Sequence, residues 1–148
     1  MANFAENRKA YFNYDILEKI TAGLELLGFE VKSVRAGRMS LDGSYAIVRG
    51  GEAFLVGAAV TPLQPKNVMP GYDERRPRKL LLTKKEIARL AGLESKQGLT
   101  LVPISVYNIG RKIKLDLGVG RGKKKADKRT SIRKRETARE IDRTLKNT

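Results

Sequence analysis

Residues 44–57, SYAIVRGGEAFLVG, give the clearest indication of the fold. Two short apolar runs, Ser44–Arg49 and Glu52–Gly57, flank the adjacent glycines Gly50 and Gly51. Adjacent glycines supply the positive φ angles that a tight two-residue turn requires. The stretch therefore predicts an antiparallel β-hairpin, and Ala58–Thr61 can continue its second strand.

The sequence after residue 98 predicts two further antiparallel strands. Leu99–Tyr107 is rich in β-branched residues, and Pro103 within it indicates a sheet edge or a β-bulge. Asn108–Arg111 reads as a turn, and Lys112–Leu117 then alternates strictly between apolar and polar residues. Alternation of this kind places one set of side chains in the core and the other set outside. The outer set is Lys112, Lys114 and Asp116.

Helical and mixed patterns occupy the rest of the first hundred residues. Thr83 and Glu86 form a capping box, which predicts a helix over about Lys84–Leu93. Asn7–Leu27 alternates first and then shows helical spacing, so we expect a strand that runs into a short helix ending at Gly28. Phe29–Ala36 is rich in valine and aromatic residues, and we expect a strand there.

The pattern as a whole predicts a mainly β protein with flanking helices. About five or six short strands joined by hairpins suit a small closed barrel of the oligonucleotide-binding (OB) type, because closure removes exposed sheet edges. We expect the barrel to occupy residues 1–120 and a basic C-terminal tail to occupy residues 121–148. The tail has too few apolar residues for a core, so we expect it to be disordered alone and helical when bound.

Composition excludes several functional classes. The 148 residues include no cysteine and no histidine, so thiolate sites, a cysteine nucleophile and a histidine base are absent. The acids Glu18, Glu30, Asp42 and Glu52 are scattered, and we expect them on the surface. No apolar run approaches the roughly 18–20 residues of a membrane span, and the start has no signal-peptide pattern. We expect a cytoplasmic binding protein that is not an enzyme and uses no cofactor or metal.

The net charge of +15 is concentrated near the C-terminus. Residues 111–148 hold 15 basic and 5 acidic residues, a net of +10, which leaves +5 for residues 1–110. This asymmetry indicates a polyanionic partner for a basic arm. Gly118, Gly120 and Gly122 lie at its root, but their spacing matches no phosphate-binding loop. We expect them to form a hinge where the chain leaves the last strand.

The residues alone leave more than one binding function open. A strongly basic tail suits RNA, with an affinity that falls steeply with salt. A general structured-RNA-binding or ribosome-associated protein with a basic extension fits the same pattern. A peripheral membrane module fits less well, because the tail lacks the bulky apolar face of an interfacial helix.

A series of collinear motifs resembles the small protein B (SmpB) family of tmRNA (SsrA)-binding proteins. In chain order they are Asn7–Ala10, Ala22–Leu24, Gly28–Gly37, Ser44–Ala46, Gly51–Ala53, Arg78–Leu82, Leu99–Pro103, Gly122–Lys124 and Asp127–Arg129. The resemblance implies an OB-type barrel that binds the tRNA-like domain of tmRNA. It also implies delivery of alanyl-tmRNA, with elongation factor Tu, to stalled ribosomes. The tail then occupies the decoding centre of the small subunit and the empty mRNA channel.

The resemblance also assigns site residues. Leu81 and Lys114 fall on positions of the family's tmRNA-binding surface, and the full set expected there is Asn7, Arg8, Lys9, Thr21, Lys32, Arg35, Lys79, Leu81, Lys112 and Lys114. The set expected in the ribosome-binding tail is Arg121, Lys123, Lys124, Lys125, Asp127, Lys128, Arg129, Arg133, Lys134 and Arg135. The sequence departs from the family pattern at Thr21, where glutamate is common, at Tyr11-Phe12 and at Ala126.

Overall fold

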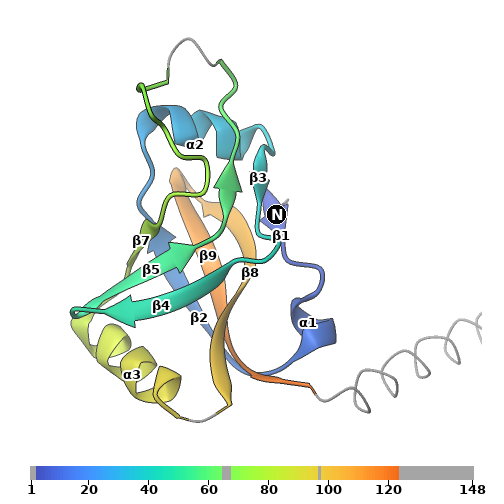
Figure 1. Cartoon of the computed structure of the whole chain (residues 1–148), viewed down its shortest axis with the longest axis vertical. Coiled ribbons are helices and arrows are strands. Elements are labelled where there is room, and N and C mark those ends of the chain that lie inside the picture. Colours follow the sequence, from blue (N-terminus) through green and yellow to red (C-terminus); the bar gives the residue numbers. More distant parts are fainter. Residues whose placement is uncertain (1–2, 65–67, 97, 124–148) are drawn as a thin grey trace, which may run out of the picture.

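A computed structural model describes residues 3–64, 68–96 and 98–123 of the chain. Its elements, in chain order, are β1 (Ala5–Glu6), α1 (Ala10–Asn13), β2 (Tyr14–Leu24), α2 (Gly28–Arg35), β3 (Met39–Ser40), β4 (Tyr45–Arg49), β5 (Glu52–Val56), β6 (Ala59–Val60), β7 (Arg78–Leu81), α3 (Lys84–Glu94), β8 (Leu99–Ile109) and β9 (Lys112–Gly122) (Figure 1).

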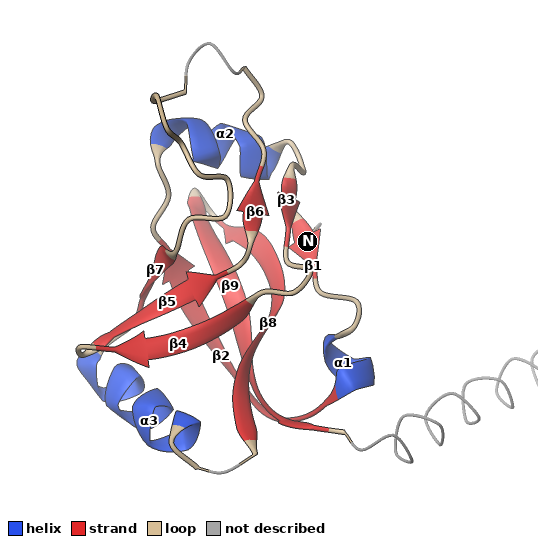
Figure 2. Ribbon diagram, in the orientation of Figure 1, coloured by secondary structure: helices blue, strands red, loops and turns tan. Residues whose placement is uncertain are grey.

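The principal sheet closes into an antiparallel ring. Its strand order is β1-β8-β4-β5-β7-β2-β9, and β9 also pairs with β8, so the sheet has the form of a barrel (Figure 2). Strands β3 and β6 pair separately beside the ring. The expectation of a mainly β, barrel-like fold with flanking helices is confirmed. Ala58–Thr61 does not extend the hairpin, because β6 leaves β5 to pair with β3.

Two elements were predicted correctly from local sequence patterns. The hairpin β4–β5 turns at Gly50 and Gly51, whose φ angles are 60° and 76°. Helix α3 begins after Thr83, whose hydroxyl accepts a hydrogen bond from the backbone N–H of Glu86. Leu90 on this helix is fully buried against the barrel.

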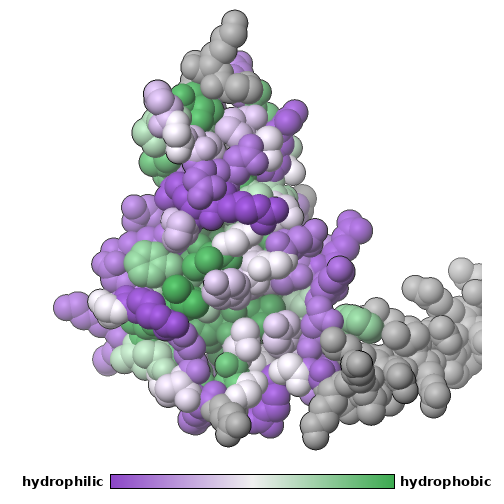
Figure 3. All heavy atoms as spheres, in the orientation of Figure 1, coloured by the Kyte–Doolittle hydropathy of each residue, from purple (hydrophilic) through white to green (hydrophobic). Residues whose placement is uncertain are grey.

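The core is aliphatic, as the composition indicates. Ile113, Leu115 and Leu117 of β9 point inward and are buried, as the alternation predicts. On the outside of the barrel, hydrophobic residues gather over the β4–β5 face (Figure 3).

The interpretation of Asn7–Leu27 as a strand followed by a helix is wrong. Strand β2 runs from Tyr14 to Leu24 and pairs with β9 along its length. The register shifts between Ile16 and Glu18, which is a β-bulge at Leu17. A bulge moves the alternation by one residue, so Ile16 faces outward while Ile20 packs on the core. The resulting apolar spacing resembled that of a helix.

The segment Phe29–Ala36, expected as a strand, is helix α2. Gly28 begins this helix and does not end one. Glu30 caps its first turn, because its carboxylate accepts a hydrogen bond of 2.8 Å from the Leu27 N–H. Glu30, Ser33 and Val34 are buried at helical spacing, so packing of one helix face outweighs the modest β propensity of the sequence.

The glycines expected as a hinge belong to β9. A Cβ at Gly118 would lie 2.8 Å from Ile104 Cδ1, and one at Gly120 would lie 3.0 Å from Tyr14 Cβ. The glycines therefore allow side chains of β2 and β8 to lie flat across β9. Around them, Ala10, Val102 and Ile104 form a second small core with Tyr14 and Ile16. Of the two alternatives that Pro103 indicated, a sheet edge or a β-bulge, the register shift after this residue confirms the bulge.

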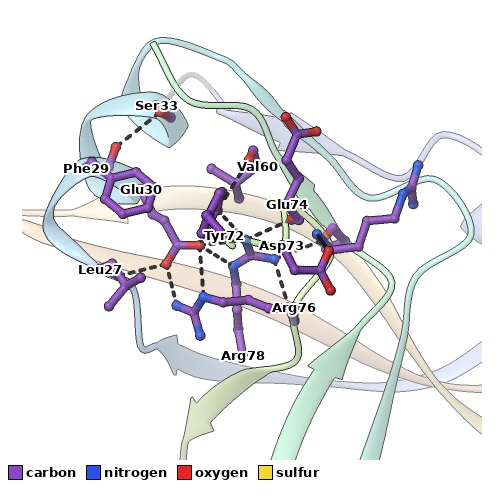
Figure 4. A network of polar contacts seen from close by, with 12 residues as sticks. Leu27, Phe29, Glu30, Ser33, Val60, Tyr72, Asp73, Glu74, Arg76 and Arg78 are labelled. Atoms are coloured by element: carbon purple, nitrogen blue, oxygen red, sulfur yellow. Dashed lines mark hydrogen bonds and ion pairs between the residues drawn. The ribbon is translucent and has the colours of Figure 1, made fainter. Parts of the chain in front are cut away.

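Glu30 was expected on the surface, but it is fully buried at the centre of a polar network (Figure 4). Its Oε2 atom accepts hydrogen bonds from Arg78 Nη2 at 2.6 Å, from Tyr72 at 2.7 Å and from Arg76 Nε at 3.2 Å. Arg78, also fully buried, donates to the carbonyls of Ala58 and Glu74. The network joins α2 to the segment that precedes β7.

Burial alone would raise the pKa of Glu30. Hydrogen bonds from Arg76, the Leu27 amide, Tyr72 and Arg78 outweigh that effect and lower the pKa to about 2. The carboxylate is therefore charged throughout the neutral range. Burial and the bond to Glu30 raise the pKa of Tyr72 to about 12, so its hydroxyl stays protonated and donates.

We expect Gly120→Ala to destabilise the fold by about 1–3 kcal/mol, because the new methyl group would press on Tyr14 Cβ next to the β2 backbone. Gly122→Ala is the matched control, since a Cβ there meets nothing within 4 Å, and it should change stability by about 0.5 kcal/mol or less. Urea denaturation measures both values. Equal effects would contradict the packing role of Gly120.

We expect Glu30→Gln to destabilise the protein by about 3–5 kcal/mol, because two arginines lose their buried counter-charge. The folded pKa of about 2 lies below the ordinary value of 4.5, so the wild-type stabilisation is present above pH 4.5 and is lost as the pH falls through 2. The variant should lack this part of the pH dependence. Thermal unfolding between pH 2 and 7 tests both effects.

Glu52→Gln is the control for that series, since Glu52 forms a half-exposed ion pair with Lys79. Its effect should stay within about 1 kcal/mol. Unchanged acid sensitivity in Glu30→Gln would show that other carboxyl groups govern it.

Candidate nucleic-acid interface

The outward side of β2, β7, β8 and β9 brings most of the predicted interface together. Thr21 lies opposite Asp116, Gly23 lies opposite both Lys114 and Leu81, and Tyr107 lies opposite Lys114. We call this region the outer sheet face, and it comprises Lys19, Thr21, Gly23, Leu81, Tyr107, Lys114 and Asp116.

Leu81 provides an apolar surface at one side of this face. Its side chain is 51% exposed. It lies over Gly23, where an added Cβ would come within 3.0 Å of Leu81 Cβ. A hollow of about 420 Å³ beside it is lined by Gly23, Leu24, Leu81, Lys112, Ile113 and Lys114. An apolar surface flanked by ammonium groups suits a nucleotide, which combines an apolar base with a phosphate.

A second hollow, of about 550 Å³, adjoins the first at Leu81 and Lys114. Its lining includes Thr21 and Lys79, so these two predicted residues join the same region. Lys79 is ion-paired with Glu52 at 3.1 Å, and its charge is therefore partly compensated.

A hydrogen-bonded carboxylate lies in the middle of the outer sheet face. Asp116 Oδ1 accepts hydrogen bonds from the Tyr107 hydroxyl at 2.6 Å and from Thr21 Oγ1 at 3.2 Å. The bond to Asp116 is the main cause that raises the pKa of Tyr107. Tyr107 therefore remains a donor at neutral pH. The structure brings these groups together from three strands.

Lys19 adds a cation on the same face. Its Nζ atom lies 5.3 Å from the centre of the Tyr11 ring. Its contact with Tyr11 and, to a smaller extent, the charge of Asp116 raise its pKa. Sequence reasoning missed Lys19, Tyr107 and Asp116. The alternation already placed Asp116 beside Lys114, but nothing in the sequence showed its partners on β2 and β8.

Arg35, Lys112 and Lys114 form a basic rim beside the outer sheet face, which extends to the turn between β8 and β9. Arg35 at the end of α2 donates a hydrogen bond of 2.9 Å to the carbonyl of Arg111. Lys112 follows directly on β9 and lines the hollow beside Leu81. The predicted residues Arg35, Lys112 and Lys114 thus follow one another along one side of the barrel.

Four predicted residues lie elsewhere. Asn7 and Lys9 line a separate hollow of about 510 Å³ near α1, with Arg8 between them in the chain. The Asn7 side chain donates to the carbonyl of Pro103 at 2.9 Å, which gives it a structural role. Lys32 lines another hollow, of about 440 Å³, between α2 and Leu63.

The first residues expected in the tail are still attached to the barrel. Arg121 is part of β9 and pairs with Asp15 and Leu99, so the strand continues past the expected boundary at residue 120. Lys123 donates to the carbonyl of Tyr11 at 3.0 Å. The other residues expected in the tail lie outside the described part of the chain: Lys124, Lys125, Asp127, Lys128, Arg129, Arg133, Lys134 and Arg135.

Among the described residues, no group of three or more acidic, histidine or cysteine side chains is placed to hold a metal ion. No helix in the described ranges has the length and hydrophobicity needed to span a membrane.

Comparisons with known proteins agree over nearly the whole chain. The model of the family described as SmpB protein matches residues 4–147. The SsrA-binding protein of Chloroflexus aurantiacus is 54% identical over 142 residues, which cover 96% of this chain and 89% of that protein. The SsrA-binding protein of Gloeobacter violaceus is 48% identical over 141 residues, covering 95% and 92%.

A solved structure supports the same assignment. A chain from the structure described as "tmRNA-SmpB: a journey to the center of the bacterial ribosome" is 45% identical, with a TM-score of 0.67. The match covers 81% of this chain and 84% of that one. Sequence and fold thus point to one group of proteins, and the chain belongs to the SmpB family.

Proposed function

We propose that this protein binds the tRNA-like domain of tmRNA and enables trans-translation, the rescue of stalled ribosomes. The observation that carries the proposal is the outer sheet face, where exposed Leu81 lies beside Lys114 and the basic rim. Family membership supports it, because relatives that are about half identical are named SsrA-binding proteins. The role is one of binding and not of catalysis.

The outer sheet face and the basic rim together provide two kinds of contact that structured RNA requires. Lys19, Lys112, Lys114 and Arg35 supply positive charge for phosphates, and each phosphate that they neutralise releases counterions. Leu81 supplies an apolar surface for a base that is not stacked in a helix. Because these residues are held by paired strands and by α2, the face is formed before the RNA arrives.

The C-terminal tail completes the proposal. Its basic residues bind the ribosome, chiefly at the decoding centre of the small subunit, while the barrel holds tmRNA. Alanyl-tmRNA arrives with elongation factor Tu. The similarity to a chain from the structure described as "tmRNA-SmpB: a journey to the center of the bacterial ribosome" supports a role together with tmRNA and the ribosome. A protein that acts there works in the cytoplasm.

We expect Lys114→Ala to weaken binding of the tRNA-like domain about 3–10-fold and to lower the magnitude of its log–log salt slope by about 1, because one phosphate contact is lost. Lys96→Ala is the charge-matched control, since Lys96 is exposed beyond the end of α3. Binding isotherms at several salt concentrations give both quantities. If both variants behaved alike, Lys114 would not be part of the interface.

We expect a protein truncated after Lys123 to bind the tRNA-like domain about as well as the full chain, but to fail in tagging of stalled peptides. The cut keeps β9 and the hydrogen bond from the Lys123 N–H to the Asn13 carbonyl. A reconstituted translation reaction with a message that lacks a stop codon measures tagging. Normal tagging by the truncated protein would overturn the two-part mechanism.

A further inference from the structure

Asp116 is an acid on a face that is otherwise basic. It lies two residues from Lys114 on the same side of β9, and its charge also acts on Lys19. A carboxylate repels phosphates, so its presence lowers the general affinity of this face for RNA. Its position therefore needs a reason other than attraction to the RNA backbone.

The carboxylate is held in one orientation. Tyr107 and Thr21 both donate to Oδ1, and these residues come from the strands on either side of β9. Among the described residues, no hydrogen bond or ion pair uses Oδ2. The side chain is only partly buried. A fixed acceptor atom is thus left for a ligand, and its orientation requires no rearrangement on binding.

The chemistry of a carboxylate limits what that ligand can be. An ionised carboxylate only accepts hydrogen bonds, so it cannot bind a phosphate oxygen and needs an N–H or O–H group. RNA offers such donors at the amino and imino groups of unpaired bases and at the ribose 2′-hydroxyl. Leu81 and Lys114 are close by for the apolar base surface and the phosphate.

We propose that Asp116 determines RNA specificity: its Oδ2 atom accepts a hydrogen bond from a base N–H or a 2′-hydroxyl of a nucleotide bound on the outer sheet face. The inference rests on the proposed function. Thr21 and Tyr107 are positioning residues, which orient the carboxylate. Lysines on the face then provide affinity, and Asp116 selects among RNAs.

Asp116→Asn separates this role from simple electrostatics. Because Tyr107 donates, the amide oxygen stays with Tyr107, and the amide NH₂ replaces Oδ2, which changes an acceptor into a donor. Removal of a negative charge alone would raise the affinity for any RNA. Loss of a specific acceptor instead weakens the binding of the correct RNA.

The test measures binding of full-length variants to the tRNA-like domain of tmRNA and to an unrelated hairpin of equal length, at one salt concentration. We expect Asp116→Asn to weaken binding of the tRNA-like domain about tenfold, as for a lost hydrogen bond to a charged group. Hairpin binding should stay unchanged or become tighter. The matched control is Glu74→Gln, an exposed acid outside this face, which should affect both RNAs alike.

Nucleotide-analogue interference identifies the donor. Separate pools of the tRNA-like domain carry either 2′-deoxy nucleotides or base analogues that each lack one N–H donor. Inosine, purine riboside and zebularine replace guanosine, adenosine and cytidine to remove the amino groups, and N-methylated bases remove the imino donors. We expect one position that weakens binding by the wild-type protein but not by Asp116→Asn. Identical interference patterns for the two proteins would overturn the inference.

The remaining outcomes are also distinct. A wild-type protein without preference for the tRNA-like domain would overturn the proposed function itself. A wild-type preference that Asp116→Asn retains would overturn only the role of Asp116. Equal loss for both RNAs, together with a lower melting temperature, would show that Asp116 acts in folding and not in selection.

Discussion

Strand β9 holds the barrel together. It pairs with β2 over Tyr14–Gly23 on one side and with β8 over Leu99–Ile109 on the other, and these hydrogen bonds close the sheet. Because the side chains of a strand alternate between two faces, the strand whose residues fill the core also places Lys114 and Asp116 on the outside. The barrel and its candidate interface are therefore consequences of one pairing.

In the closed barrel, the outer surface of β9 has a covered end and an exposed end. At one end, Gly118 and Gly120 let Ile16 and Ile104 cover the strand, and a second small core forms. At the other end the surface stays open around Leu81. The buried Glu30 network fixes α2 at this open end, where Arg35 reaches the β8–β9 turn. Packing therefore covers the outer surface of β9 at one end and leaves it exposed at the other.

The interface that results has charge of both signs. In our proposal its lysines and arginine attract RNA over a distance, but such attraction does not distinguish one RNA from another. A carboxylate held by two hydroxyl groups reduces that general attraction and offers an acceptor for one correctly placed donor. In our proposal the barrel provides affinity and selection on the same face, while the basic tail binds the ribosome.

The sequence alone determined the features that depend on neighbouring residues. The Gly50-Gly51 turn, the capping box at Thr83 and the alternation over Lys112–Leu117 are local, and each was predicted correctly. The motifs also identified the family and most of the basic rim. Three other features became visible only in the fold: residues 28–35 form a helix, Glu30 is buried, and Thr21 donates a hydrogen bond to a carboxylate 95 residues away. These outcomes depend on partners that are distant in the chain, which local patterns do not encode.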